Sequence, residues 1–260
     1  MMYDLDLVVP MFRPQAGWNQ IMAQRLEAFL SHLPEVKVQL ILVNDGTPSY
    51  VSPDDFACLE ALCAVRYESY PENQGKGYAV RHGATCSTAP FMMFTDVDFP
   101  YEAEDMAMMY QYLVDNEPDV IVGTRANTYY EVAPTFRTWV SKSLKGMIKL
   151  LMRLPISDSQ GGLKAFSPYG RAVLVNTTVN RYLFDLELVK MAAHQANLQL
   201  DTLPVHLRKE IEFTSLSPAL LLREGLNFLQ VMFKPVKPIH KPEWVKTAKV
   251  ASGSPTPENR

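Results

Sequence analysis

Short apolar runs alternate with helix-like segments along the first 125 residues, and this alternation leaves few folds open to the chain. The runs at 5–9, 38–43, 64–67, 91–94 and 119–122 have the length of buried strands. Amphipathic segments at 19–30, 53–63, 77–84 and 102–115 separate them. Strands that alternate with helices predict an α/β fold, in which helices cover both faces of a mostly parallel central sheet.

The second half of the chain is less regular. Helices are predicted at 135–153, 181–196 and 218–233, and strands after the polar loop 158–167 and at 198–207. We expect one domain over residues 1–217 and a C-terminal amphipathic helix over 218–233. Residues 234–260 are rich in proline and lysine, and this composition predicts a disordered tail.

Composition limits the classes of function. The 260 residues, 47% of them hydrophobic, suffice for one large core, and a net charge of −3 argues against nucleic acid as a partner. Cys58, Cys63 and Cys86 lack the spacing of a metal site or a disulfide framework, which is typical of a reducing cytosol. The sequence shows no signal peptide and no apolar run long enough to span a bilayer. We therefore expect a cytoplasmic protein, soluble or peripheral at the inner face of a membrane.

Two carboxylates, Asp96 and Asp98, follow the apolar run at 91–94. In an open α/β sheet the carboxyl ends of the strands face the ligand crevice. Two acids there repel each other unless a positive group lies between them. A Mg²⁺ or Mn²⁺ ion that also contacts a phosphorylated ligand meets this need. The alternative is a solvated acidic loop.

Two further loops carry groups suited to a nucleotide. Asp45 follows the second predicted strand, where a carboxylate can contact a base or ribose, although Asp-Gly is also common in simple turns. Lys76 lies between two glycines before a predicted helix, where an ammonium and backbone N–H groups can meet a pyrophosphate. A plain helix-entry loop is the alternative there.

Basic residues recur on the predicted helix at 135–153. Arg125 follows a strand, and Arg137, Ser141 and Lys145 are spaced four apart, so the last three share one helix face. Guanidinium and hydroxyl groups on one face suit a phosphate. The same helix is half apolar, and a basic amphipathic helix can also lie on an anionic membrane. Packing of the apolar stripe into the core is the third interpretation.

Several of these stretches, taken in order, resemble family-2 glycosyltransferases of the GT-A fold. Within that family the resemblance is to the polyprenyl-phosphate (dolichyl-phosphate) synthases that transfer glucose or mannose. The matching segments are residues 8–10, 43–48, 73–77, 94–98, 123–125, 137–141, 158–166 and 181–187. The resemblance as a whole covers the chain from about residue 5 to residue 217.

The resemblance implies an inverting transfer of a sugar from a UDP-glucose-like or GDP-mannose-like donor to a polyprenyl phosphate or another acceptor. It implies that Pro10, Phe12, Asp45, Lys76 and Asp96 bind the nucleotide, and that Asp98, with Asp96, binds Mg²⁺ or Mn²⁺. Arg125, Arg137 and Ser141 are implied to bind phosphates, including that of a lipid acceptor. Asp158 is the candidate general base, which only a hydroxyl acceptor requires.

Departures from the family pattern leave other functions open. Asn44 replaces an acid, Pro100 stands where lipid-phosphate enzymes often carry a metal-contacting glutamine, and residues 214–217 replace a Gly-Ser-Lys segment. One alternative is a non-catalytic relative that binds a nucleotide sugar, and another is a nucleotidyltransferase. The donor sugar, the acceptor and a homodimeric state all stay open at this point.

Overall fold

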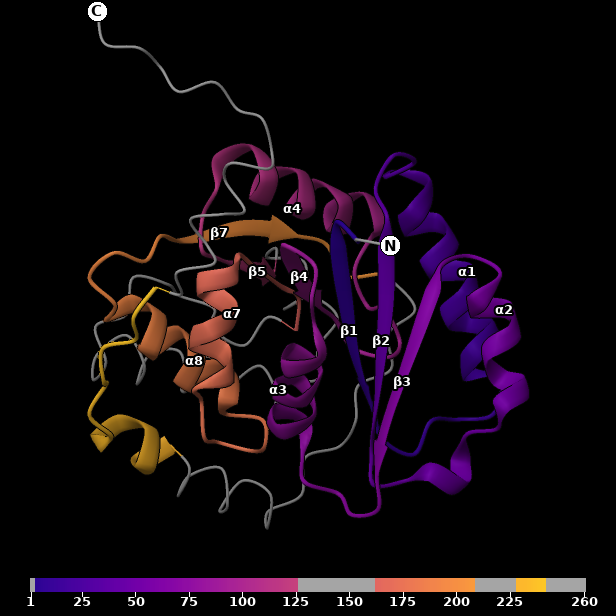
Figure 1. The fold of residues 1–260 in the computed structure, drawn as a ribbon, viewed down its shortest axis with the longest axis horizontal. Helices are drawn as coiled ribbons and strands as arrows, with labels where there is room; N and C mark the ends of the chain where they lie inside the picture. The colour runs from indigo at the N-terminus through magenta and orange to yellow at the C-terminus, as the bar shows by residue number, and fades with distance from the viewer. Residues whose placement is uncertain (1–2, 126–161, 209–227, 242–260) are drawn as a thin grey trace, which may run out of the picture.

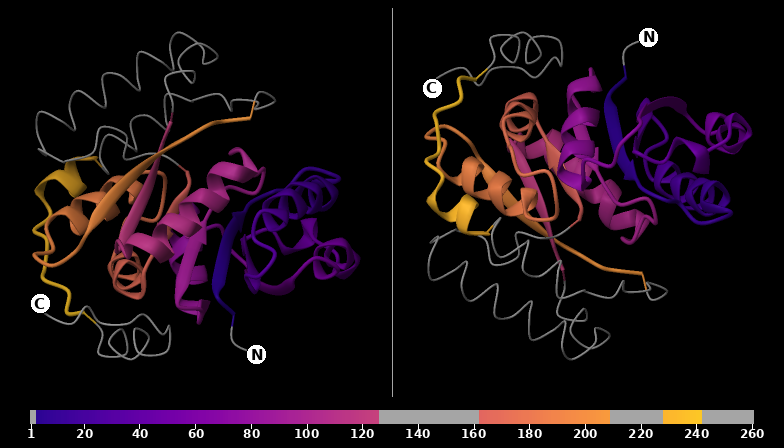
Figure 2. Two further views of the ribbon diagram at one scale, coloured as in Figure 1. Left: turned by 90° about the horizontal axis from the view of Figure 1, so that it is seen from above. Right: turned by 90° about the horizontal axis from the view of Figure 1, so that it is seen from below.

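The computed structural model describes residues 3–125, 162–208 and 228–241. These residues form one seven-stranded sheet in the order β3-β2-β1-β4-β6-β5-β7, with helices on both faces (Figures 1 and 2). The strands are β1 (Leu5–Met11), β2 (Val38–Asp45), β3 (Ala64–Tyr70), β4 (Phe91–Phe94), β5 (Val120–Arg125), β6 (Lys164–Phe166) and β7 (Leu200–Val205). Only β6 runs antiparallel to its neighbours β4 and β5, so the prediction of a mostly parallel sheet is confirmed.

Each face of the sheet has its own core. The helices are α1 (Trp18–Ser31), α2 (Ala57–Glu60), α3 (Lys76–Cys86), α4 (Ala103–Asn116), α7 (Pro168–Val175) and α8 (Phe184–Ala193), with 3-10 turns at Pro48–Tyr50 and Pro53–Phe56. Side chains of α1, α2 and α4 pack in one core, and those of α3, α7 and α8 pack in the other. No helix in the described residues combines the length and the apolar composition needed to cross a bilayer.

The strands and helices predicted in the first half are present, and several are a few residues longer than predicted. One predicted helix has a different structure. The segment predicted as a helix at 53–63 is a 3-10 turn followed by the four-residue α2. In the second half α7 was not predicted. Its signals were Ser167, whose hydroxyl accepts from the N–H groups of Tyr169 and Gly170, and Pro168 in the first turn.

Residues 228–241 pack on the rest of the protein. Residues 228–233 are helical, and Phe228 and Val231 are buried in the core beside α8. The sequence predicted disorder from residue 234 onward, but the structure places 234–241 along α8. Polar side chains of α8 and the turn after it hold this backbone: Lys190 Nζ donates to three carbonyl oxygens, and Gln195 accepts from the N–H of Ile239 at 2.8 Å.

Candidate active site

Both halves of the chain contribute residues to one edge of the sheet. In the parallel strands, Val8 pairs with Phe94 and Met11 with Asn44, so the residues after β1, β2 and β4 lie at the same edge. The antiparallel β6 begins at this edge, because Lys164 pairs with Phe94. Chain reversal at β6 therefore brings a buried lysine beside the loop of Asp96 and Asp98.

Asp45 fixes the loop of residues 73–76, called here the 73–76 loop. Its Oδ1 accepts from the N–H of Gln74 at 2.7 Å, and its Oδ2 accepts from Gly75 N–H at 2.9 Å and from Asn73 Nδ2 at 2.6 Å. The carboxylate is almost fully buried. Both oxygens are thus engaged by the protein, and Asp45 orients the loop that carries Lys76.

The departure at Asn44 has a structural reason. Its amide oxygen accepts from the N–H and the hydroxyl of Thr47, at 3.0 and 2.9 Å. Its Nδ2 donates to the Thr47 carbonyl and to the hydroxyl of Tyr67 at 2.9 Å. A carboxylate has no donor for the Thr47 carbonyl. Asparagine therefore builds the turn after β2 from a fully buried position.

Lys76 and Asp96 form an ion pair across the site. Lys76 Nζ lies 2.5 Å from Asp96 Oδ1, and both side chains are partly exposed, at 22% and 34%. Burial opposes the charged ammonium, but the Asp96 and Asp185 carboxylates outweigh it and raise the pKa of Lys76. Lys76 is also the first residue of α3, and the N–H groups of Gly75 and Tyr78 at this helix start are bound by Asp45 and by the Asn180 carbonyl.

Asp98 lies in a strained turn after β4. The N–H of Phe99 donates to the Asp96 carbonyl at 2.9 Å, and Phe99 is buried with a φ of 42°, which is unfavourable for a residue other than glycine. Arg25 of α1 donates to the Asp98 carbonyl. Desolvation of the carboxylate by the surrounding protein raises the pKa of Asp98, and the charge of Asp96 raises it further, although Asp98 is exposed at the surface.

A second ion pair lies beneath the first and was not predicted as part of the site. Lys164 Nζ lies 2.5 Å from Asp185 Oδ1, and the two side chains are 0% and 7% exposed. Burial raises the pKa of Asp185, with Lys164 and then Lys76 acting in the opposite direction. The Lys164 ammonium also lies 5.3 Å from the centre of the Phe94 ring. The signal in the sequence was two charged residues within otherwise apolar segments.

Gly162 packs directly on Asp96. A Cβ at position 162 would lie 2.6 Å from Asp96 Oδ2, so a side chain there would displace this carboxylate. The Gly162 N–H donates to the hydroxyl of Tyr101 at 2.7 Å. Tyr101 is buried and follows the Asp98 turn. The two loops that bear the acids and Gly162 therefore brace each other.

The remaining predicted nucleotide contacts lie at the end of β1. Pro10 is a buried strand residue, whereas Phe12 is 46% exposed. The Arg13 guanidinium lies 5.1 Å from the centre of the Phe12 ring, and the Arg13 N–H donates to Thr47 Oγ1 at 3.1 Å. This edge thus offers an accessible aromatic ring beside a cation.

Four of the predicted phosphate-binding and catalytic residues are described in their backbone alone or lie outside the described residues. The backbone of Arg125 ends β5 beside Val205. Arg137, Ser141 and Asp158 lie outside the described residues, so their roles stay predictions.

The donor atoms of the acid pair fit a hard divalent ion. Asp96 and Asp98 supply carboxylate oxygens, which Mg²⁺ and Mn²⁺ prefer, and their mutual repulsion favours a cation between them. Among the described residues one other group brings three candidate ligand atoms within 4.8 Å, from Glu68, His82 and Cys86. Arg66 already binds this glutamate at 2.8 Å, and the nitrogen and sulfur donors suit softer ions.

The sheet has the GT-A fold of glycosyltransferases of known structure. Glucosyl-3-phosphoglycerate synthase of Mycobacterium tuberculosis shares the fold with a TM-score of 0.63 at 15% identity, over 90% of this chain and 82% of that one. The mannosyltransferase PcManGT from Pyrobaculum calidifontis, solved with GDP-Man and Mn²⁺, has a TM-score of 0.54 at 14% identity. That match covers 99% of this chain and 66% of the mannosyltransferase.

The sequence profile of Glycosyl transferase family 2 matches residues 7–174, and the chain belongs to this family. The dolichyl-phosphate beta-glucosyltransferase of Drosophila melanogaster is 27% identical over 231 residues, which cover 83% of this chain and 70% of the relative. The human dolichyl-phosphate beta-glucosyltransferase is 25% identical, over 72% of this chain and 62% of that protein. The family assignment disfavours the nucleotidyltransferase alternative.

Proposed function

We propose that the protein is a metal-dependent, inverting glycosyltransferase that moves a hexose from a nucleotide-diphosphate sugar to a polyprenyl phosphate. The observation that carries this proposal is the group of Lys76, Asp96 and Asp98 at the carboxyl edge of the sheet. Glucose is the favoured hexose, because the curated relatives are named as dolichyl-phosphate beta-glucosyltransferases.

The charge arrangement supports diphosphate binding. Lys76, the first residue of α3, presents positive charge at the carboxyl edge of the sheet. A Mg²⁺ or Mn²⁺ ion held by Asp98 and Asp96 would supply a Lewis acid that stabilises the negative charge of the leaving diphosphate. Phe12 offers its exposed ring to the base. Asp45 fixes the loop that carries Lys76, and Gly162 packs against Asp96, so both charged groups are held in place for diphosphate binding.

The acceptor decides whether a base is required. A phosphate is already ionised at neutral pH and can attack the anomeric carbon without losing a proton to the enzyme. Arg125, Arg137 and Ser141 would then bind this phosphate and reduce its repulsion from the donor. A sugar hydroxyl needs a general base, and Asp158 is the candidate. Near-normal transfer by Asp158→Asn would exclude an obligatory base at this position.

The C-terminal helix suggests how the protein reaches a lipid. Leu229 and Phe233 are four residues apart and are 47% and 76% exposed, whereas Phe228 and Val231 face the core. The exposed Lys241 lies further along the same segment. An exposed apolar pair with a nearby lysine suits an anionic bilayer surface. We expect the double variant Leu229→Ser/Phe233→Ser to float less with vesicles that contain anionic lipid, and binding that ignores lipid charge contradicts this attachment.

The decisive experiment is a transfer assay with separated products. Radiolabelled UDP-glucose or GDP-mannose is incubated with the protein, Mn²⁺ or Mg²⁺, and polyprenyl phosphate in detergent. We expect label to enter the organic phase as a polyprenyl-phosphate sugar, and to remain in the aqueous phase when EDTA removes the metal. Metal-dependent binding of the donor without transfer to any acceptor supports the non-catalytic alternative instead.

A further inference from the structure

The backbone of the first turn of α3 packs directly against the backbone of residues 177–181, which lie between α7 and α8. A Cβ at Gly75 would lie 2.5 Å from the carbonyl oxygen of Asn180, and a Cβ at Gly77 would lie 2.5 Å from that of Val179. These contacts leave no room for a side chain between the two backbones. The position of α3's first turn therefore depends on what holds the segment below it.

Glu187 of α8 holds this segment from the protein interior. Its Oε2 accepts from the N–H groups of Thr178 and Val179, both at 2.7 Å, and its Oε1 accepts from the Thr178 hydroxyl at 3.0 Å. The side chain is 2% exposed. Two consecutive N–H groups on one carboxylate oxygen fix both the place and the orientation of the backbone.

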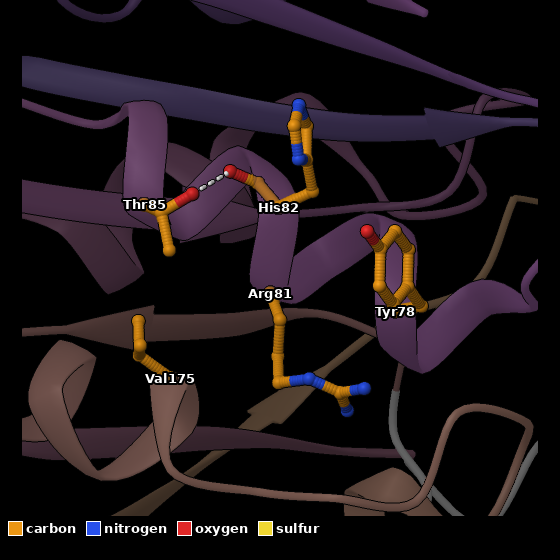
Figure 3. A pocket seen from close by; sticks show the side chains of 5 residues that line it. All are labelled: Tyr78, Arg81, His82, Thr85 and Val175. Carbon is orange, nitrogen blue, oxygen red and sulfur yellow. Dashed lines mark hydrogen bonds between the residues drawn. The ribbon is translucent and has the colours of Figure 1, made fainter. Parts of the chain in front are cut away.

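Arg81 of α3 grips the same segment from the other side. Its guanidinium donates to the Val179 carbonyl at 2.8 Å and to Asn180 Oδ1. Arg81 and His82 leave α3 in opposite directions (Figure 3), and the arginine reaches the 177–181 segment. Glu187 and Arg81 thus clamp the segment between α8 and α3.

The cation in direct contact with Glu187 comes from the C-terminal segment. Lys234 Nζ lies 2.6 Å from Glu187 Oε1 and donates to Thr178 Oγ1 at the same distance. A buried carboxylate without a partner is strongly unfavourable. Residues 228–241 are themselves held on α8 through Lys190. The network therefore runs from the C-terminal segment, through Glu187, to the turn that begins with Lys76.

We propose that Glu187 is a positioning residue for nucleotide-sugar binding, and that Lys234 makes the C-terminal segment 228–241 part of the donor site. This inference rests on the proposed function. Loss of the Lys234 charge leaves the buried Glu187 carboxylate without the cation that contacts it, and among the described residues only the more distant charges of Arg81 and Lys190 then act on it. The carboxylate then recruits water or rotates away, the clamp loosens, and the first turn of α3 loses its fixed distance to Asp96.

The test compares Lys234→Met with Lys237→Met. Lys237 is an exposed lysine of the same segment, and among the described residues it is its backbone carbonyl alone that is hydrogen-bonded. The probes are UDP and GDP with Mn²⁺, titrated by calorimetry without lipid or acceptor. For the nucleotide that the wild type binds, we expect Lys234→Met to raise the dissociation constant about tenfold, Lys237→Met to leave it unchanged, and Lys234→Arg to restore most of the affinity.

A double variant separates charge balance from simple loss of a contact. Glu187→Gln removes the buried charge and keeps an oxygen that accepts the two N–H groups. Combined with Lys234→Met, it should bind the nucleotide more tightly than Lys234→Met alone. A purely structural role predicts lower unfolding temperatures in both variants, with unchanged dissociation constants well below those temperatures.

Hydrogen exchange keeps the inference testable without a ligand. In Lys234→Met the amides of residues 75–79 should exchange faster than in the wild type, while those of Lys237→Met should not. A wild type that binds neither nucleotide contradicts the proposed function. In that case the exchange rates alone test whether Lys234 stabilises the first turn of α3. Unchanged exchange in Lys234→Met, or nucleotide affinity equal to that of the wild type, overturns the positioning role.

Discussion

The two Lys–Asp pairs of the site have the same separation of 2.5 Å and opposite environments. Lys76 and Asp96 are 22% and 34% exposed, whereas Lys164 and Asp185 are 0% and 7% exposed. A pair in contact with solvent can exchange its partner for a ligand at little cost. A buried pair cannot, since separation leaves an uncompensated charge in the interior. We infer that the first pair serves binding and that the second holds the sheet edge in shape.

The largest effect that sharpens this contrast is expected for Lys164→Met. Removing one partner of a buried pair leaves the Asp185 charge unbalanced, which typically costs about 3–5 kcal/mol of unfolding free energy. Denaturant unfolding measures the loss. The double variant Lys164→Met/Asp185→Leu should recover most of it, because neither charge then remains. A single variant as stable as the wild type would contradict a structural role for the pair.

Asp98→Asn should cause the next largest effect, and it acts on catalysis. A neutral amide is a poorer ligand for a divalent ion, so transfer should fall at least about 100-fold and require more Mn²⁺. Asp54→Asn, at an exposed acid outside the site, is the matched control. Stability should change little, because the Asp98 side chain reaches solvent. Activity retained at low Mn²⁺ would remove Asp98 from the metal site.

The positions of the candidate site residues were predictable where these residues lie directly after a strand. The runs before Asp45 and Asp96 have a clear strand pattern, and the carboxyl ends of parallel strands share one edge. The partners of these acids were harder to predict. Asp45 binds a loop about 30 residues further along the chain, and no local pattern shows this contact.

The buried half of the site escaped prediction for a topological reason. Lys164 reaches the acids only because β6 runs antiparallel to β4, and strand direction is not visible in a three-residue strand. Glu187 and Lys234 are 47 residues apart and meet only through the packing of residues 228–241 on α8. Tertiary contacts of this kind do not leave a periodic signal in the sequence.

Lys76→Met tests the partly exposed ion pair of Lys76 and Asp96. Loss of a charged contact to the diphosphate should raise the KM for the donor about tenfold, in line with the strength of charge-assisted hydrogen bonds. The KM for the acceptor should not change. The unfolding free energy should fall by less than about 1 kcal/mol, because the pair with Asp96 is partly solvated. A stability loss as large as that of Lys164→Met would show that the two pairs are alike.

The smallest effect is expected at Phe12, which tests whether the accessible part of the edge also selects the base. Stacking of an aromatic ring on a base contributes about 1 kcal/mol, so Phe12→Ala should raise the donor KM roughly fivefold. Phe12→Leu keeps an apolar side chain without a ring, and it should resemble Phe12→Ala if stacking is the cause. The ring is 46% exposed, so neither variant should lower stability measurably. If Phe12→Leu binds the donor as the wild type does, the contact is apolar packing and the ring carries no role of its own.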